Sequence, residues 1–142
     1  MEKSKQEKDT MITDEITRFI EGISLAIVAS ADVSGNPHLA LASGIKALDG
    51  HHLMLENWYC QTTLRNLDQN PRITIAVMAQ DSKIGYQFIG NVVHGYDVAI
   101  LNGYVPEAEQ PGELQTLTRL VVRVEQILAF CSGVHTDRPL GG

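Results

Sequence analysis

The chain has 142 residues, of which 44% are hydrophobic and 20% are charged, as is usual for one soluble globular domain. Eleven basic and seventeen acidic side chains give a formal net charge of −6, which disfavours binding to nucleic acid through counterion release. Two cysteines are too few for a disulfide framework, and no apolar run has the length needed to cross a bilayer. A cytoplasmic protein with reduced thiols, and with neither a membrane nor a nucleic-acid partner, is expected.

The N-terminal residues 1–10, MEKSKQEKDT, carry charges throughout and are interpreted as a mobile leader. They lead into no apolar segment, which argues against a secretory signal. A helix is predicted next, because Ile16, Phe19 and Ile20 share one face at the spacing i, i+3, i+4. Thr13 is its expected N-cap, and Gly22 is its expected stop.

The segments that follow alternate as β-strands do. Residues 23–30, ISLAIVAS, are rich in β-branched side chains, and the turn formers ADVSGNP come directly after them. Residues 38–48 are predicted to be the returning strand of a hairpin. A further turn, LDGHH, leads to a strand over 52–57.

Residues 56–71, ENWYCQTTLRNLDQNP, interrupt this pattern with many hydrogen-bonding side chains. Leu64 and Leu67 fit one face of a short helix. Because a residue before proline is driven out of the α region, the helix should end before Pro71. The stretch is either an ordinary crossover helix or the place where a ligand is held.

Three more segments complete the domain. Residues 72–80 and 84–96 are predicted strands, and Gly85, Gly90 and Gly95 mark bulges or close approaches in the second. One or two helical turns are considered at 98–101, before a loop rich in proline and glycine, and a long strand is predicted over 114–130.

Five or six short-spaced strands with one crossover helix favour a closed or nearly closed antiparallel barrel, because closure removes exposed sheet edges. The barrel domain is predicted over 11–130. Residues 131–142 form a C-terminal tail with little periodicity.

No established catalytic motif is present: the nucleophile elbow, the P-loop and the Gly-x-Gly-x-x-Gly fingerprint are all missing from the sequence. No metal site is predicted, because the histidines lack helical ligand spacing and no Cys-x-x-Cys occurs. His38 and His94 fall on predicted strands and could meet in space. Cys60 precedes the crossover helix without a basic neighbour, so an inert thiol is favoured over a nucleophile.

The adjacent Thr62 and Thr63 support two interpretations. A helix N-terminus exposes unpaired N–H groups and the positive end of the peptide dipoles, which attract phosphate. Two threonine hydroxyls and the guanidinium of Arg65 would strengthen such a site. Alternatively, Thr63 simply caps the helix, as threonine often does.

The order of a hairpin, an Asp-Gly turn, the stretch E-N-W-Y-C-x-x-T-x-x-N-L-x-x-N-P and a strand ending G-Y-Q-F-I-G resembles the pyridoxamine 5′-phosphate oxidase-like flavoproteins. The small FMN-binding proteins are the branch closest in size, and the resemblance covers about Ile16 to Phe130. It implies a mainly β fold, a six-stranded antiparallel split β-barrel of the FMN-binding type. It also implies a homodimer with two FMN sites at the subunit interface.

In such relatives the FMN phosphate is held at the start of the crossover helix, commonly by a Lys-Thr pair followed three residues later by Asn. Thr63 and Asn66 match this pattern, whereas Thr62 stands where the lysine usually stands. The cofactor-binding residues implied by the resemblance are Ala40, Leu41, Ala42, Ser43, Glu56, Asn57, Trp58, Gln61, Thr62, Thr63, Arg65 and Gln87. The tail over 134–140 is matched to a segment that reaches the partner's flavin in some relatives.

The resemblance implies an FMN-dependent oxidoreductase or electron-transfer protein that acts on an unidentified small molecule, with no catalytic residue assigned. The alternative is a non-catalytic split barrel that binds flavin or haem. Thr62 in place of lysine favours that alternative, and His94 or His38 would then serve a haem.

Overall fold

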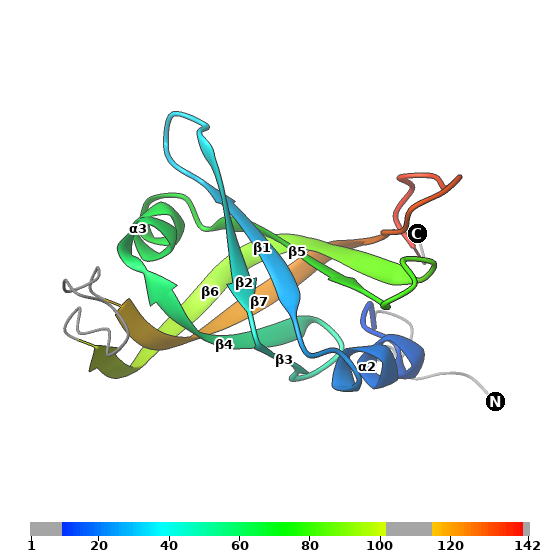
Figure 1. Cartoon of the computed structure of the whole chain (residues 1–142), viewed down its shortest axis with the longest axis horizontal. Coiled ribbons are helices and arrows are strands. Elements are labelled where there is room, and N and C mark those ends of the chain that lie inside the picture. Colours follow the sequence, from blue (N-terminus) through cyan, green and yellow to red (C-terminus); the bar gives the residue numbers. More distant parts are fainter. Residues whose placement is uncertain (1–9, 102–114, 141–142) are drawn as a thin grey trace.

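A computed structural model describes residues 10–101 and 115–140 of the chain. One antiparallel sheet of seven strands curls into a half-closed barrel, with a short helix near each end (Figure 1). The elements are α2 (Asp14–Glu21), β1 (Ala26–Ala31), β2 (Pro37–Ala42), β3 (Gly44–Ala47), β4 (His52–Cys60), α3 (Gln61–Gln69), β5 (Arg72–Met78), β6 (Gly85–Leu101) and β7 (Gln115–Ala129). The mainly β, antiparallel architecture agrees with the prediction.

The order of strands across the sheet is β2-β1-β5-β6-β7-β4-β3. The strands at the two edges of the sheet, β2 and β3, are consecutive in the chain. Only Ser43 separates them, and there the chain passes from pairing with β1 to pairing with β4. The curled sheet therefore brings its two edges, β2 and β3, together at Ser43 without a hydrogen-bonded ladder between them. At this point a Cβ on Gly44 would lie 3.1 Å from the carbonyl oxygen of Glu56, so glycine allows the close approach. The structure thus has seven strands rather than the expected six, since the predicted strand over 38–48 is two short ones.

Helix α2 begins and ends where the sequence predicts. The Thr13 hydroxyl accepts a hydrogen bond from the Ile16 N–H at 3.3 Å, and Gly22 is the C-cap. Ile16 and Ile20 are buried, and the ring of Phe19 meets Tyr86 of β6 edge-on with 5.1 Å between centroids. This helix is thereby fixed to the barrel by apolar contacts.

The long hairpin of β6 and β7 depends on glycines at two close approaches. A Cβ at Gly90 would lie 2.0 Å from the Arg123 carbonyl oxygen, and one at Gly85 would lie 2.3 Å from that of Phe130. The ladder shifts register at Ile89/Gly90, so the predicted close approach there is confirmed. The helical turns considered at 98–101 do not form, because β6 continues to Leu101 in its pairing with β7.

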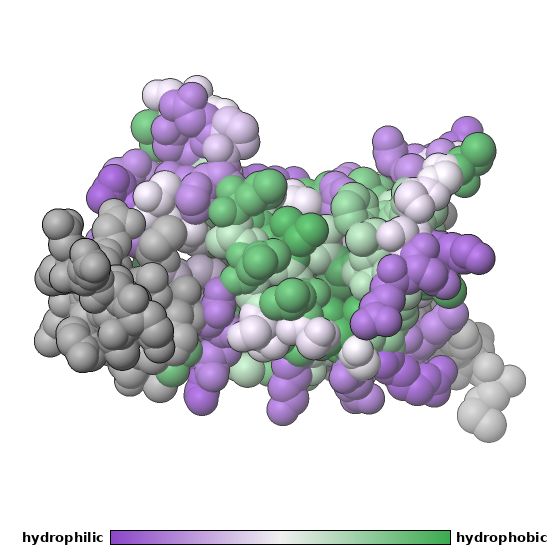
Figure 2. Space-filling view, in the orientation of Figure 1, coloured by the Kyte–Doolittle hydropathy of each residue, from purple (hydrophilic) through white to green (hydrophobic). Residues whose placement is uncertain are grey.

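The inner face of the sheet is packed with aliphatic and aromatic side chains, whereas part of its outer face is also apolar. Leu25, Ile27, Leu39 and Leu41 are all exposed, and Ile27 stands directly opposite Leu41 in the β1–β2 ladder. Figure 2 shows a continuous hydrophobic area over this part of the sheet. Neither described helix combines the length and hydropathy needed to span a bilayer.

Candidate functional site

Three chain segments that the sequence assigned to one cofactor site meet at the seam between β2 and β4. The side-chain amide of Asn57, on β4, donates a hydrogen bond to the carbonyl oxygen of Leu41, on β2. These two strands share no ladder, so this contact joins the edge strand β2 to β4, which lies next to the other edge strand, β3. Helix α3 begins at Gln61, directly after β4 ends, and so its first turn lies at the same seam.

The residues of α3 divide into distinct faces. Thr63 and Asn66 are buried, and the Asn66 side chain donates to the Ser30 hydroxyl of β1 at 3.3 Å. Thr62 is exposed. The first turn contains no acidic residue, so no carboxylate of the helix offsets the positive end of its dipole. The backbone N–H groups of that turn have no intrahelical partner and suit an anion.

Glu56 is engaged by a residue that the sequence did not indicate. Its carboxylate accepts a hydrogen bond from the Nε–H of Arg119, which stands opposite it in the β4–β7 ladder. The pair is about half exposed, so its contribution to stability is small. Arg119 nevertheless places a second guanidinium, besides Arg65, within two strands of the seam.

Two of the predicted cofactor residues are not placed at the seam by the structure. Gln87 pairs with Ala76, which pairs with Ile27, which pairs with Leu41, so three interstrand steps separate Gln87 from β2. At the usual strand spacing this is roughly 14 Å. Within one chain, Gln87 does not join the seam. The side chain of Trp58 lies outside the described part of the structure.

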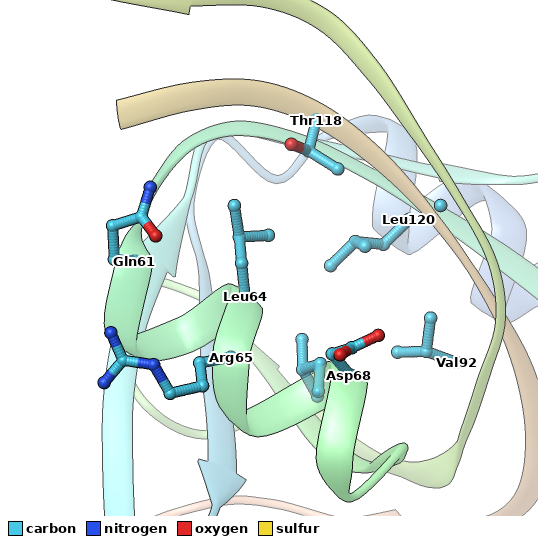
Figure 3. Close-up of a pocket in the computed structure, with 9 residues that line it drawn as sticks. Gln61, Leu64, Arg65, Asp68, Val92, Thr118 and Leu120 are labelled. Atoms are coloured by element: carbon cyan, nitrogen blue, oxygen red, sulfur yellow. The ribbon is translucent and has the colours of Figure 1, made fainter. Parts of the chain in front are cut away.

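A cavity of about 550 Å³ opens beside α3, between the helix and the inner face of the β6–β7 hairpin (Figure 3). In Figure 3 the Leu64 side chain points into the cavity and the Asp68 carboxylate lies toward Val92 and Leu120, whereas the Arg65 guanidinium points away. The lining residues are Gln61, Leu64, Arg65, Leu67, Asp68, Val92, Gly95, Thr118 and Leu120.

A family profile described as pyridoxamine 5′-phosphate oxidase matches residues 12–131. The chain belongs to this family. No curated protein matches this chain in sequence.

Solved structures resemble this pyridoxamine 5′-phosphate oxidase family member over most of its length. HupZ from Group A Streptococcus is 21% identical, with a TM-score of 0.61 over 89% of this chain and 99% of HupZ. An FMN-binding protein from Syntrophomonas wolfei is 14% identical, with a TM-score of 0.59 over 84% and 85%. HutZ, the haem storage protein from Vibrio cholerae, is 12% identical, with a TM-score of 0.53 over 84% and 94%. The predicted split-barrel fold is confirmed.

Polar groups gather inside this family member beneath α3. Ser30, Thr63, Asn66 and Thr118 are the buried polar residues in the described part of the chain. Tyr59, two residues before α3, is also buried, and within that part its hydroxyl has no hydrogen-bond partner. Burial raises the pKa of the Tyr59 phenol well above its usual value. The end of the barrel that the seam and α3 share is therefore polar inside as well as outside.

The strands that carry the two histidines considered as a pair are not neighbours in the sheet. His38 is on β2 and His94 is on β6, with β1 and β5 between them. Among the described residues no group of three His, Cys, Asp or Glu side chains is placed to hold a metal ion.

Proposed function

We propose that the chain binds FMN at the seam, with the phosphate at the N-terminus of α3. The carrying observation is the convergence of two chain segments there, Ala40–Ser43 and the continuous stretch from Glu56 to Arg65, joined by the bond from Asn57 to Leu41. Membership of the pyridoxamine 5′-phosphate oxidase family supports the assignment. The groups at the start of α3 fit a phosphate: the exposed Thr62 and the solvent-facing guanidinium of Arg65 lie near the positive end of the helix dipole, and the first turn has no carboxylate.

The residues of the first turn have different parts in this proposal. Thr62 is exposed and available to a phosphate oxygen, whereas Thr63 is fully buried and anchors the first turn in the interior. Arg65 provides the charge that a lysine at position 62 would otherwise supply, and a charge-assisted hydrogen bond is stronger than a neutral one. The backbone of β2 over Ala40–Ser43 then lies beside the ring system.

Bound FMN would supply reversible electron transfer, so the function we propose is that of a flavin-dependent oxidoreductase or electron-transfer protein for a small molecule. The chain's part is to hold the phosphate, to orient the ring along β2 and to exclude water from one ring face. No side chain at the seam needs to act as a strong acid or base in this function. The low cysteine content supports a cytoplasmic location.

The proposal includes a homodimer with the cofactor sites at its interface. The exposed apolar area of β1 and β2, which contains Ile27, Leu39 and Leu41, borders the seam and is of the kind that a second copy covers. Sedimentation equilibrium should give twice the chain mass at micromolar concentration, and a monomer would refute the interface.

Haem binding is the second candidate, and the similarity in fold to the haem storage protein HutZ favours it. The absence of a lysine at position 62 also favours haem, because a phosphate ligand loses a charged donor there. The half-buried His38 and the exposed His94 are the candidate axial ligands, and each would have to act in a separate site.

The visible spectrum of the purified protein separates these proposals. Added FMN should give a bound flavin spectrum that bleaches with dithionite and recovers in air. Thr62→Val should weaken FMN binding several-fold, and Thr62→Lys should tighten it about tenfold by restoring a charged donor. Thr17→Val, at a partly exposed threonine of α2 at the other end of the barrel, is the matched control and should leave FMN binding unchanged. A protein that ignores FMN refutes the flavin proposal, and a Soret band after addition of haemin supports the alternative.

A further inference from the structure

The cavity beside α3 has the size and the mixed lining of a small-molecule site. Its volume of about 550 Å³ falls within the range of roughly 300–1,000 Å³ that is typical of ligand pockets. Leu64, Val92 and Leu120 give it apolar walls from three different elements. Figure 3 shows these side chains converging on one space, with polar groups at its two ends.

The cavity lies on the opposite side of α3 from the proposed phosphate contact. Successive residues of an α-helix are rotated by about 100°, so Leu64 and Thr62 project about 200° apart. Leu64 points into the cavity, and Thr62 therefore points away from it. A molecule in the cavity and a phosphate on Thr62 would be separated by the body of the helix.

The cavity is lined by one negative charge, on the exposed side chain of Asp68, and by one positive charge, on the exposed side chain of Arg65. The Asp68 carboxylate lies toward the apolar walls, whereas the guanidinium of Arg65, one turn earlier, points out to solvent. Asp68 takes part in no ion pair with any residue in the described ranges. A carboxylate beside an apolar surface favours a cationic donor on an apolar body, because a charged hydrogen bond and apolar burial act together.

We propose that this cavity is a second binding site, specific for a small organic ammonium ion with an aromatic or branched aliphatic body. The ammonium group donates to Asp68, and the body covers Leu64, Val92 and Leu120. At the far end the Gln61 amide, which the resemblance assigned to the cofactor site, lines this cavity instead and is placed to meet a hydroxyl or carbonyl group of the ligand. A ligand with a phosphate is disfavoured, since the carboxylate repels it and Arg65 is turned away. The occupant therefore differs from FMN and from any phosphorylated substrate held at the seam.

The test is a titration of the full chain with 2-phenylethylamine, followed by two-dimensional NMR and by calorimetry. The neutral analogue 2-phenylethanol and the anionic analogue 3-phenylpropionate are run alongside it. We expect the amine to bind at least fivefold more tightly than the alcohol, and the acid not to bind. Asp68→Asn should reduce the affinity for the amine to that for the alcohol. Glu21→Gln, which removes an exposed carboxylate from α2 at the other end of the barrel, should leave it unchanged.

A second measurement distinguishes this site from the flavin site. The amine and FMN should bind together, so saturating FMN should leave the affinity for the amine unchanged, and Asp68→Asn should leave the FMN spectrum unchanged. Competition between FMN and the amine would overturn the proposal by placing both in one cavity. Equal binding of the amine to Asp68→Asn, or no binding to the unaltered chain, would also overturn it. If FMN does not bind but the amine does, the seam proposal fails and this one stands.

Discussion

The two ends of the barrel are closed by helices of similar length but different chemistry. At the α2 end, Ile16 and Ile20 fill the interior, and the helix carries its own N-cap at Thr13. At the α3 end the interior holds Asn66, hydrogen-bonded to Ser30. Apolar packing tolerates no solvent and serves stability, whereas buried polar groups must be matched by partners and fix one arrangement. The α2 end thus stabilises the fold, and the α3 end holds the buried polar residues next to the candidate site.

Ile20→Ala should cause the largest loss of stability and should act at the apolar end alone. The side chain is 1% exposed, and truncation of such a residue costs about 3 kcal/mol in transfer and cavity terms. Urea unfolding monitored by circular dichroism measures the change. Ile84→Ala, at an isoleucine that is 57% exposed, is the control and should cost less than about 0.5 kcal/mol.

The affinity of folded Ile20→Ala for FMN should equal that of the unaltered protein. If this substitution weakened FMN binding as much as Thr62→Val does, the two ends would not be separate in function. The contrast drawn between α2 and α3 would then be wrong.

Asn66→Ala should destabilise the protein less than Ile20→Ala does, but it should lower both the stability and the affinity for FMN. It removes the bond to Ser30 and leaves that hydroxyl buried without its partner, at a cost of about 1–2 kcal/mol. Because Asn66 ties the middle of α3 to β1, its loss should also weaken FMN binding at the first turn. Asn70→Ala, at the residue directly after α3, whose bond to the Ala31 carbonyl at 3.4 Å is only half buried, is the matched control.

A double-mutant cycle with Ser30→Ala separates the bond from its surroundings. A coupling free energy of about 0.5–1 kcal/mol between the two substitutions is expected if the hydrogen bond itself holds the helix. Additive effects would mean that Asn66 acts through packing rather than through Ser30.

Local signals in the sequence predicted the elements well where one residue pattern decides the structure. The spacing of Ile16, Phe19 and Ile20, with Thr13 before them, predicted α2 and its cap. The pattern failed at 98–101, where pairing of β6 with β7 extends a strand that the local sequence leaves ambiguous. It also missed the division at Ser43, because the two halves of that segment pair with β1 and β4, which are far apart in the sheet.

The site was predicted less completely, for a related reason. The segments around Leu41, Asn57 and Thr62 were indicated by resemblance, and the structure brings them to one seam. Arg119, by contrast, lies 63 residues after Glu56, and only the β4–β7 ladder brings the two together. The walls of the cavity at Val92 and Leu120 likewise come from strands that nothing in the sequence connects with α3.

Of these substitutions, Tyr59→Phe should change the stability of the protein least, and it should raise stability rather than lower it. Removing the hydroxyl relieves a buried polar atom of its missing hydrogen bond, so stability at pH 7 should rise by about 1 kcal/mol. Burial raises the pKa of Tyr59 in the folded chain above the value near 10 of an unfolded tyrosine. Between these two values the unfolded state loses the proton while the folded state keeps it, so stability falls as the pH rises.

The advantage of Tyr59→Phe over the unaltered chain should therefore widen above about pH 10, by up to about 1.4 kcal/mol per pH unit. Urea unfolding at pH 7 and pH 10.5 measures both the offset and the slope. Tyr86→Phe is the comparison, because Tyr86 is less buried and packs at the α2 end against Phe19. Burial and the nearby Glu15 carboxylate also raise the pKa of Tyr86, so its slope should have the same sign but be smaller. A loss of stability in Tyr59→Phe at pH 7 would mean that the hydroxyl has a partner in the folded protein. The Tyr59 hydroxyl beneath α3 would then be hydrogen-bonded like its polar neighbours. The two ends of the barrel would differ in the composition of their interior but not in an unmet hydrogen bond.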